Sequence, residues 1–325
     1  MNEYRGEDFF EDRTAEKNRL KRLSRYSGFA IILFLIIEEF FNLLVSSKHV
    51  YPLFEQNELF YECCQLLIPM ISIAVPFLLA GSLIKKDRAY ADVDLMPLGK
   101  PKDTFLGIIA VPSGVTICLL ASNLTGYFTA FLEKIGFTLT APDTSPPTDT
   151  FAVILYVVRL TVTAAVIEEI CMRGIVMQSL RRYGDGFALI MSSVIFSLMH
   201  CNLLQIPFAL IAGIVIGFSV LATGTLWTGI LIHFFNNLFS AFSAFVLNAF
   251  DAQKADDIIG RVYITVCVAG AVTLLVNFFY SKSPVLSDSK LSLRATEKIR
   301  IFILSLPMLS AFAAIAWYTH YYVSI

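Results

Sequence analysis

Seven residues at helical spacing, six of them polar, lie within or beside long apolar runs, and their side chains together could activate a water molecule. They form three groups in chain order: Glu168, Glu169 and Arg173; Phe196 and His200; His233 and Asn237. A carboxylate with imidazoles can act as a general base or hold a metal ion with one open position. An amide beside an imidazole can donate hydrogen bonds to an oxyanion. An ionisable group in hydrocarbon costs at least ~2.5–3.5 kcal/mol, so each group is a functional candidate.

The spacing within the groups predicts which side chains are free to react. Glu169 and Arg173 stand four residues apart in acid-first order, so they should face each other as an ion pair. Glu168 lies about 100° further around the same helix and is left free to act. His233 and Asn237 share one helix face and present an imidazole and an amide together.

The second group places a ring one helical turn before an imidazole. We expect Phe196 to pack beside His200 and to support it rather than react. The other two histidines, His49 and His320, lie near the ends of apolar runs, where interface residues are common. The three groups therefore account for all the histidines predicted inside the apolar segments.

Composition indicates a membrane protein independently of these motifs. The chain has 325 residues, of which 56% are hydrophobic and 16% are charged, whereas soluble domains carry roughly 25% charged residues. The net charge of −1 argues against nucleic acid as a partner, because phosphate binding needs a basic surface. The six cysteines show no paired spacing, which favours buried thiols. The strongly charged first 26 residues predict a cytosolic arm rather than a cleavable signal peptide.

Nine apolar runs are long enough to cross a bilayer of roughly 30 Å, and backbone in lipid must be helical. The sequence therefore predicts an all-α, polytopic transmembrane bundle of about 8–9 spanning helices. It occupies residues 27–325, with a catalytic core at 151–247. The runs are Phe29–Val45, Cys63–Ile84, Phe105–Ser122, Phe151–Ile167, Phe187–Leu204, Ile206–Ala222, Leu226–Leu247, Tyr263–Tyr280 and Ile301–Tyr318.

Basic residues predict the orientation. They cluster in alternate connections, which places the N-terminus in the cytosol and, with nine spans, the C-terminus outside a cell membrane. Helix rise counted from the basic turn at 181–186 puts the reactive side chains at a similar depth. The far connection at 203–207 is short and apolar, so we expect their cavity to open towards the cytosol. The clusters are Arg5–Arg25, Lys85–Lys102, Arg173–Arg182 and Lys282–Arg300.

The three groups resemble the motifs of a known family. The segments 168–173 (EEICMR), 196–200 (FSLMH) and 233–237 (HFFNN) are similar to those of the CPBP family, the CAAX prenyl endopeptidases and bacteriocin-processing or Abi proteins, of the type II CAAX protease kind. The resemblance implies an intramembrane endopeptidase acting on CAAX-type or other membrane-associated peptides, including lipid-modified proteins. It implies that Glu168 and His200 activate water while His233 and Asn237 form the oxyanion site.

The resemblance leaves the role of a metal open. In one view of the family Glu168, His200 and His233 would bind a metal, with zinc as the expected ion, and the chain would be a metalloprotease. In the other view the glutamate acts without a metal. The sequence has no His-Glu-x-x-His, so a soluble zincin arrangement is excluded.

Two other functions would also use polar groups inside a membrane, and one further ion pair is predicted. A non-catalytic immunity or scaffold protein of the same fold would not need the buried polar set. A transporter would also use midplane carboxylates, but the chain shows no repeat symmetry. Glu38 and Glu39 lie mid-span, and we predict that one of them forms a structural pair with Arg159, with a substrate-gating role as the alternative.

Overall fold

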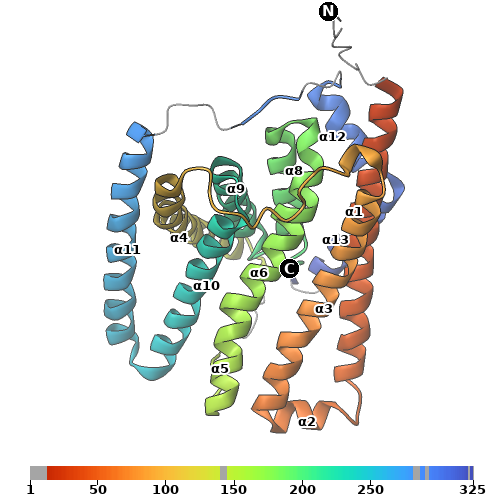
Figure 1. Ribbon diagram of the computed structural model, residues 1–325. Coiled ribbons are helices and arrows are strands. Elements are labelled where there is room, and N and C mark those ends of the chain that lie inside the picture. The colour runs from red at the N-terminus through yellow and green to blue at the C-terminus, as the bar shows by residue number, and fades with distance from the viewer. Residues whose placement is uncertain (1–12, 140–144, 281–285, 290–292, 321–322, 325) are drawn as a thin grey trace, which may run out of the picture.

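The computed structural model describes residues 13–139, 145–280, 286–289, 293–320 and 323–324, and shows an all-α bundle (Figure 1). Two two-residue strands, β1 (Thr138–Leu139) and β2 (Val323–Ser324), pair antiparallel. The first 12 residues of the predicted arm and Lys282 lie outside the described residues. The second half of that arm is helical, because α1 (Arg13–Val45) begins at Arg13 and continues into the first span.

The first half of the bundle consists of long helices that alternate in direction. After α1 these are α2 (Tyr51–Gln56), α3 (Glu58–Lys85), the short η1 (Arg88–Tyr90), α4 (Thr104–Lys134) and a helical run that crosses from Thr150 to Tyr183. That run has six parts: α5 (Thr150–Val158), η2 (Arg159–Thr163), α6 (Ala164–Glu169), η3 (Ile170–Val176), α7 (Met177–Leu180) and η4 (Arg181–Tyr183).

The second half returns through α8 (Asp185–Leu198), α9 (Ile206–Thr223), α10 (Leu226–Ala249), α11 (Ala252–Tyr280), α12 (Ala295–Ile303) and α13 (Leu306–His320). Several helices start where the sequence offers a side-chain cap. Asn57, Asp103, Asp149 and Thr225 each accept a hydrogen bond from a backbone N–H in the first turn of the following helix.

The described residues contain seven helices whose length and apolar character suffice to cross a membrane, and an eighth span if the bent pair α12–α13 is counted as one. The two helices of that pair meet at 68°. The count agrees with the lower end of the prediction, and the chain is a multi-pass membrane protein. One predicted span was wrong. Phe187–Leu204 is not one long helix, because α8 has only 14 residues and ends at Leu198.

The basic connections meet at one end of the bundle, at the top of Figure 1. The Arg22 guanidinium contacts Asp87 at 2.6 Å, and Lys298 Nζ donates to the Tyr183 carbonyl at 2.6 Å. The Asp185 N–H donates to the carbonyl of Ser287 at 3.0 Å. We call this the basic end: the start of α1 and the segments 85–103, 181–185, 224–226, 286–289 and 293–294.

A loop at 91–103 covers part of the basic end, and we call it the cap loop. Its carbonyls accept hydrogen bonds from the start of α10, from the Leu226 N–H to Pro97 at 2.8 Å and from Trp227 Nε1 to Leu98 at 2.9 Å. The Leu95 side chain is buried, and the Leu95 carbonyl lies so close to Gly174 that a β-carbon there would meet it at 2.6 Å. The cap loop is thus fixed to both α10 and η3.

Candidate active site

The Glu169–Arg173 ion pair lies at the centre of the bundle. Arg173 Nη1 donates to Glu169 Oε1 at 3.0 Å, and neither side chain is exposed. Arg173 Nη2 donates to the Gly213 carbonyl at 3.2 Å, and its guanidinium stacks over the Phe196 ring at 4.3 Å. The predicted pairing of Arg173 with Glu169 is therefore confirmed.

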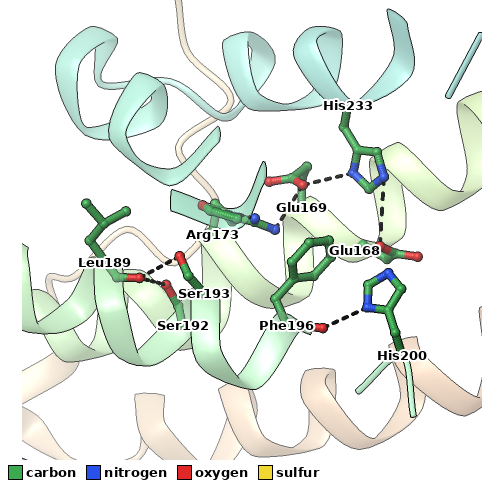
Figure 2. Close-up of polar contacts among 10 residues, drawn as sticks. Glu168, Glu169, Arg173, Leu189, Ser192, Ser193, Phe196, His200 and His233 are labelled. Carbon is green, nitrogen blue, oxygen red and sulfur yellow. Dashed lines mark hydrogen bonds and ion pairs between the residues drawn. The ribbon is translucent and has the colours of Figure 1, made fainter. Parts of the chain in front are cut away.

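His233 of α10 shares the same carboxylate. Its Nδ1 donates to Glu169 Oε1 at 3.0 Å, which fixes the ring and turns Nε2 away from the pair (Figure 2). That Nε2 lies 3.9 Å from Glu168 Oε2. Two carboxylates then face one guanidinium and one imidazole, so this four-residue cluster has no net charge when both ring nitrogens of His233 are protonated.

Glu168 differs from its neighbour Glu169 in lining the cavity and in having no bond to Arg173. Its Oε2 is buried and accepts no hydrogen bond. Its side chain is 21% exposed, whereas that of Glu169 is fully buried. The two adjacent carboxylates thus divide as predicted, one into an ion pair and one towards open space.

His200 follows α8 at the point where the chain turns. Its Nδ1 is bonded to the Phe196 carbonyl at 2.9 Å, and the two rings meet edge to face at 5.0 Å. Phe196 also meets the His233 ring edge to face at 6.1 Å. Figure 2 shows the His200 ring turned towards Glu168. Since a carbonyl only accepts, the neutral His200 ring carries its proton on Nδ1 and offers Nε2 as an acceptor.

Asn237 lies one turn beyond His233 on α10. Its Nδ2 donates to the Leu160 carbonyl at 2.8 Å, and its Oδ1 accepts from Asn236 Nδ2 at 3.2 Å. Asn236 is itself 7% exposed and was missed by the sequence reasoning. The sequence does contain a sign of it, because two adjacent amides inside an apolar run would be expected to bond to each other. The two amides hold each other, and one N–H of Asn237 remains for a ligand.

One cavity of about 960 Å³ joins these side chains. Glu168, His200, His233 and Asn237 all line it, as predicted, and so do Phe196 and Asn236. Glu169 and Arg173 lie behind its wall. The cavity is bounded by α3, α4, the α5–α6 run, α9, α10 and α11.

The direction in which the cavity extends differs from the prediction. Its lining continues from the site to Gln65 near the start of α3, Leu247 near the end of α10 and Asp256 near the start of α11. These positions lie towards the end opposite the basic end. The expected opening at the basic end was wrong because the cap loop covers that side, and sequence spacing could not show this. The connection at 203–207, expected to close the other side, instead contributes Leu204 and Gln205 to the lining.

The comparison with protein families identifies the segment that carries this site. Residues 150–239 match the family described as Type II CAAX prenyl endopeptidase Rce1-like. The match supports the resemblance to the CAAX protease family that the three motifs indicate. The match runs from the start of α5 into α10, so it contains every reactive residue predicted from the sequence. No curated protein and no solved structure matches the chain.

The Rce1-like segment also contains Arg159, whose predicted partner was wrong. Arg159 Nε donates to Glu62 Oε2 of α3 at 2.9 Å, and Nη2 donates to Glu62 Oε1 at 3.3 Å. Glu38 instead accepts a hydrogen bond from Ser72, and Glu39 accepts one from the Tyr318 hydroxyl at 2.9 Å. The mid-span carboxylates of α1 therefore have their own partners in α3 and α13.

The donors of the Rce1-like site can be tested against a metal ion. Glu168 Oε2 and the Nε2 atoms of His200 and His233 are of the types that zinc prefers, and each Nδ1 is held by an acceptor as in metal-bound imidazoles. Within the described residues, however, no three His, Cys, Asp or Glu side chains are close enough to hold one ion. As they stand these residues do not fit a metal, and the zinc site stays a prediction.

Proposed function

We propose that this membrane protein is an endopeptidase in which Glu168 activates a water molecule for attack on a peptide bond. One observation supports this above the others: Glu168 Oε2 is buried, faces the cavity and has no hydrogen-bond partner. A buried carboxylate oxygen that lacks a hydrogen bond and lies beside two imidazoles is arranged for proton transfer. The Rce1-like match supports a protease activity for the same segment.

The reaction needs no group beyond these side chains and water. Glu168 accepts a proton from the water, and the His200 Nε2 accepts a hydrogen bond from the same molecule and orients it. The water oxygen bonds to the scissile carbonyl carbon, whose π electrons move to the carbonyl oxygen. When the tetrahedral intermediate collapses, the C–N bond breaks, and Glu168 passes its proton to the leaving amine.

The developing oxyanion requires donors on the other side of the substrate carbonyl. We assign this role to Nε2–H of protonated His233 and to the free N–H of Asn237, which lie one turn apart on α10. Glu169 supports the imidazolium through Nδ1, and Arg173 compensates the charge of Glu169. Removing one such donor typically lowers kcat by ~10²–10³-fold.

We further propose a cytosolic N-terminus in a cell membrane, which follows from the basic residues that gather at one end. The cavity then extends towards the outer face. A CAAX-type or other membrane-associated peptide, including the tail of a lipid-modified protein, would reach the site from that side.

Hydrolysis of a quenched fluorescent peptide by the purified protein tests this proposal. The peptide carries a prenylated cysteine as the fourth residue from its C-terminus, so three residues follow it. Glu168→Gln should lower kcat by at least ~10²-fold. Glu39→Gln is the matched control, because Glu39 also belongs to a mid-span Glu-Glu pair but bonds to Tyr318 away from the cavity. Equal loss in both variants, or no hydrolysis by the wild type, would instead favour a non-catalytic scaffold.

A further inference from the structure

A second charged side chain faces the cavity at a distance from the reactive groups. Arg159 lines the cavity and is 21% exposed, while its partner Glu62 is 2% exposed and lies behind it. The guanidinium also lies 5.3 Å from the centre of the Tyr156 ring. Arg159 is thus held from behind by a carboxylate and from the side by a ring.

The backbone turns Arg159 into the same cavity as Glu168. Nine residues of regular α-helix would place them half a turn apart, on opposite faces. The intervening η2 is π-helical, so each residue there rotates less around the axis, and both side chains line one cavity. π-Helical turns inside α-helices are frequent at functional sites.

The hydrogen bonds of Arg159 leave donors unused. Nε and Nη2 are bound to Glu62, whereas Nη1 makes no hydrogen bond within the described part of the chain. An arginine has five N–H donors in a planar fork that matches a carboxylate. A second carboxylate can therefore bind on the cavity side without displacing the first.

The distance between Arg159 and Glu168 fits a short C-terminal segment of a peptide. By helix rise Arg159 and Glu168 are about 13 Å apart along the axis, and an extended chain spans roughly 3.3–3.6 Å per residue. The wall between them is largely apolar, with Leu160, Ala164 and Ile167 on one side and Phe208 and Ala212 on another. Three or four residues with apolar side chains would bridge this distance.

The rest of a substrate chain also has a path. Beyond Asn237 the lining continues along α10 to Ser243 and Leu247 and across to Asp256 and Tyr263 of α11. This part of the lining belongs to α10 and α11, whereas Arg159 and its partner Glu62 belong to η2 and α3. The C-terminal end of a peptide and its preceding chain can thus occupy different parts of one cavity.

The geometry points to Arg159 as a specificity-determining residue that binds the free C-terminal carboxylate of the substrate. The inference rests on the proposed peptidase function and deepens it, because it makes the enzyme selective for chain ends. Glu62 and Tyr156 position the guanidinium, and the carboxylate then sets which peptide bond lies at Glu168.

Two peptides that differ only at the terminus test this role. The prenylated peptide is prepared as the free acid and as the C-terminal amide, and kcat/KM is measured for both. A hydrogen-bonded charge pair should favour the acid by about 10–100-fold. The double variant Glu62→Gln/Arg159→Gln, which strands no buried charge, should lose this preference. Arg181→Gln, whose arginine is paired at the basic end, is the control and should keep it.

Two further measurements keep the inference testable if the double variant does not fold or if no peptide is cleaved. Arg159→Lys retains the charge without the planar fork and should reduce the acid preference. Binding of both peptides to Glu168→Gln protein reports carboxylate recognition without hydrolysis. A wild-type preference below 2-fold in both kcat/KM and binding would overturn the role of Arg159. Tighter binding of the acid without any hydrolysis would support it while refuting the peptidase proposal.

Discussion

Replacing Arg173 by alanine should unfold the protein far more readily than replacing an arginine at the surface. The Arg173 guanidinium is fully buried and has three partners: the Glu169 carboxylate, the Gly213 carbonyl and the Phe196 ring. Its removal leaves the buried Glu169 carboxylate with the His233 imidazole but without a compensating guanidinium, and breaking a buried pair costs about 3–5 kcal/mol. We expect a loss of that size in the free energy of unfolding.

The assay is reversible unfolding in mixed micelles of a mild detergent and dodecyl sulfate, which gives the free energy directly. Arg13→Ala is the control, because the Arg13–Glu297 pair has a similar length of 2.7 Å but a 52% exposed arginine. Exposed pairs contribute ~0–1 kcal/mol. The double variant Glu169→Gln/Arg173→Met removes both charges and should recover most of the loss. Equal unfolding free energies for Arg173→Ala and Arg13→Ala would refute the stranded-charge argument.

Three further predictions concern access, metal and packing. The first uses a protein without native cysteines and a charged thiol reagent. Gln65→Cys at the cavity should react with reagent supplied outside, and Arg88→Cys at the basic end should react only with reagent supplied inside. The reverse pattern would overturn the orientation. Because no three donors converge, activity should survive chelation, and a loss that zinc restores would establish the metal site. Gly174→Ala should destabilise by about 1–3 kcal/mol because its methyl meets the Leu95 carbonyl, whereas Gly126→Ala meets nothing within 4 Å and should not destabilise.

Local spacing predicted those parts of the site that depend on one helix. The Glu169–Arg173 pair is an i,i+4 contact, and the shared face of His233 and Asn237 follows from the same periodicity. Depth counted from the basic turn predicted that Glu168 lies at a similar level to His200 and His233, because the rise per residue changes little between helices. These inferences needed no knowledge of neighbouring elements.

The errors arose where tertiary neighbours decide the outcome. Arg159 could pair with any carboxylate at its depth, and only the packing of α3 against α5 selects Glu62. The π-helical turn that aims Arg159 has no marker in the sequence. An apolar run also cannot reveal whether protein or lipid surrounds it, so α8 was extended across residues that turn back at Cys201, where φ is +49°. The cap loop has no marker in the sequence either. The direction in which the cavity extends therefore could not be predicted.

The early end of α8 has a consequence for hydrolysis, which consumes water as well as peptide. The helix has 14 residues, about 21 Å by helix rise, so it ends short of a ~30 Å hydrocarbon layer. The chain then reverses through 199–205 beside the cavity, to which His200, Leu204 and Gln205 belong. Non-helical backbone at membrane depth persists only where protein or water satisfies it. Here the protein satisfies the turn, since the Cys201 N–H donates to Leu198 and the Leu204 N–H donates to Asn202 Oδ1. The reversal therefore brings the polar side chains of His200 and Gln205 into the cavity wall, where they can hydrogen-bond the second reactant, water.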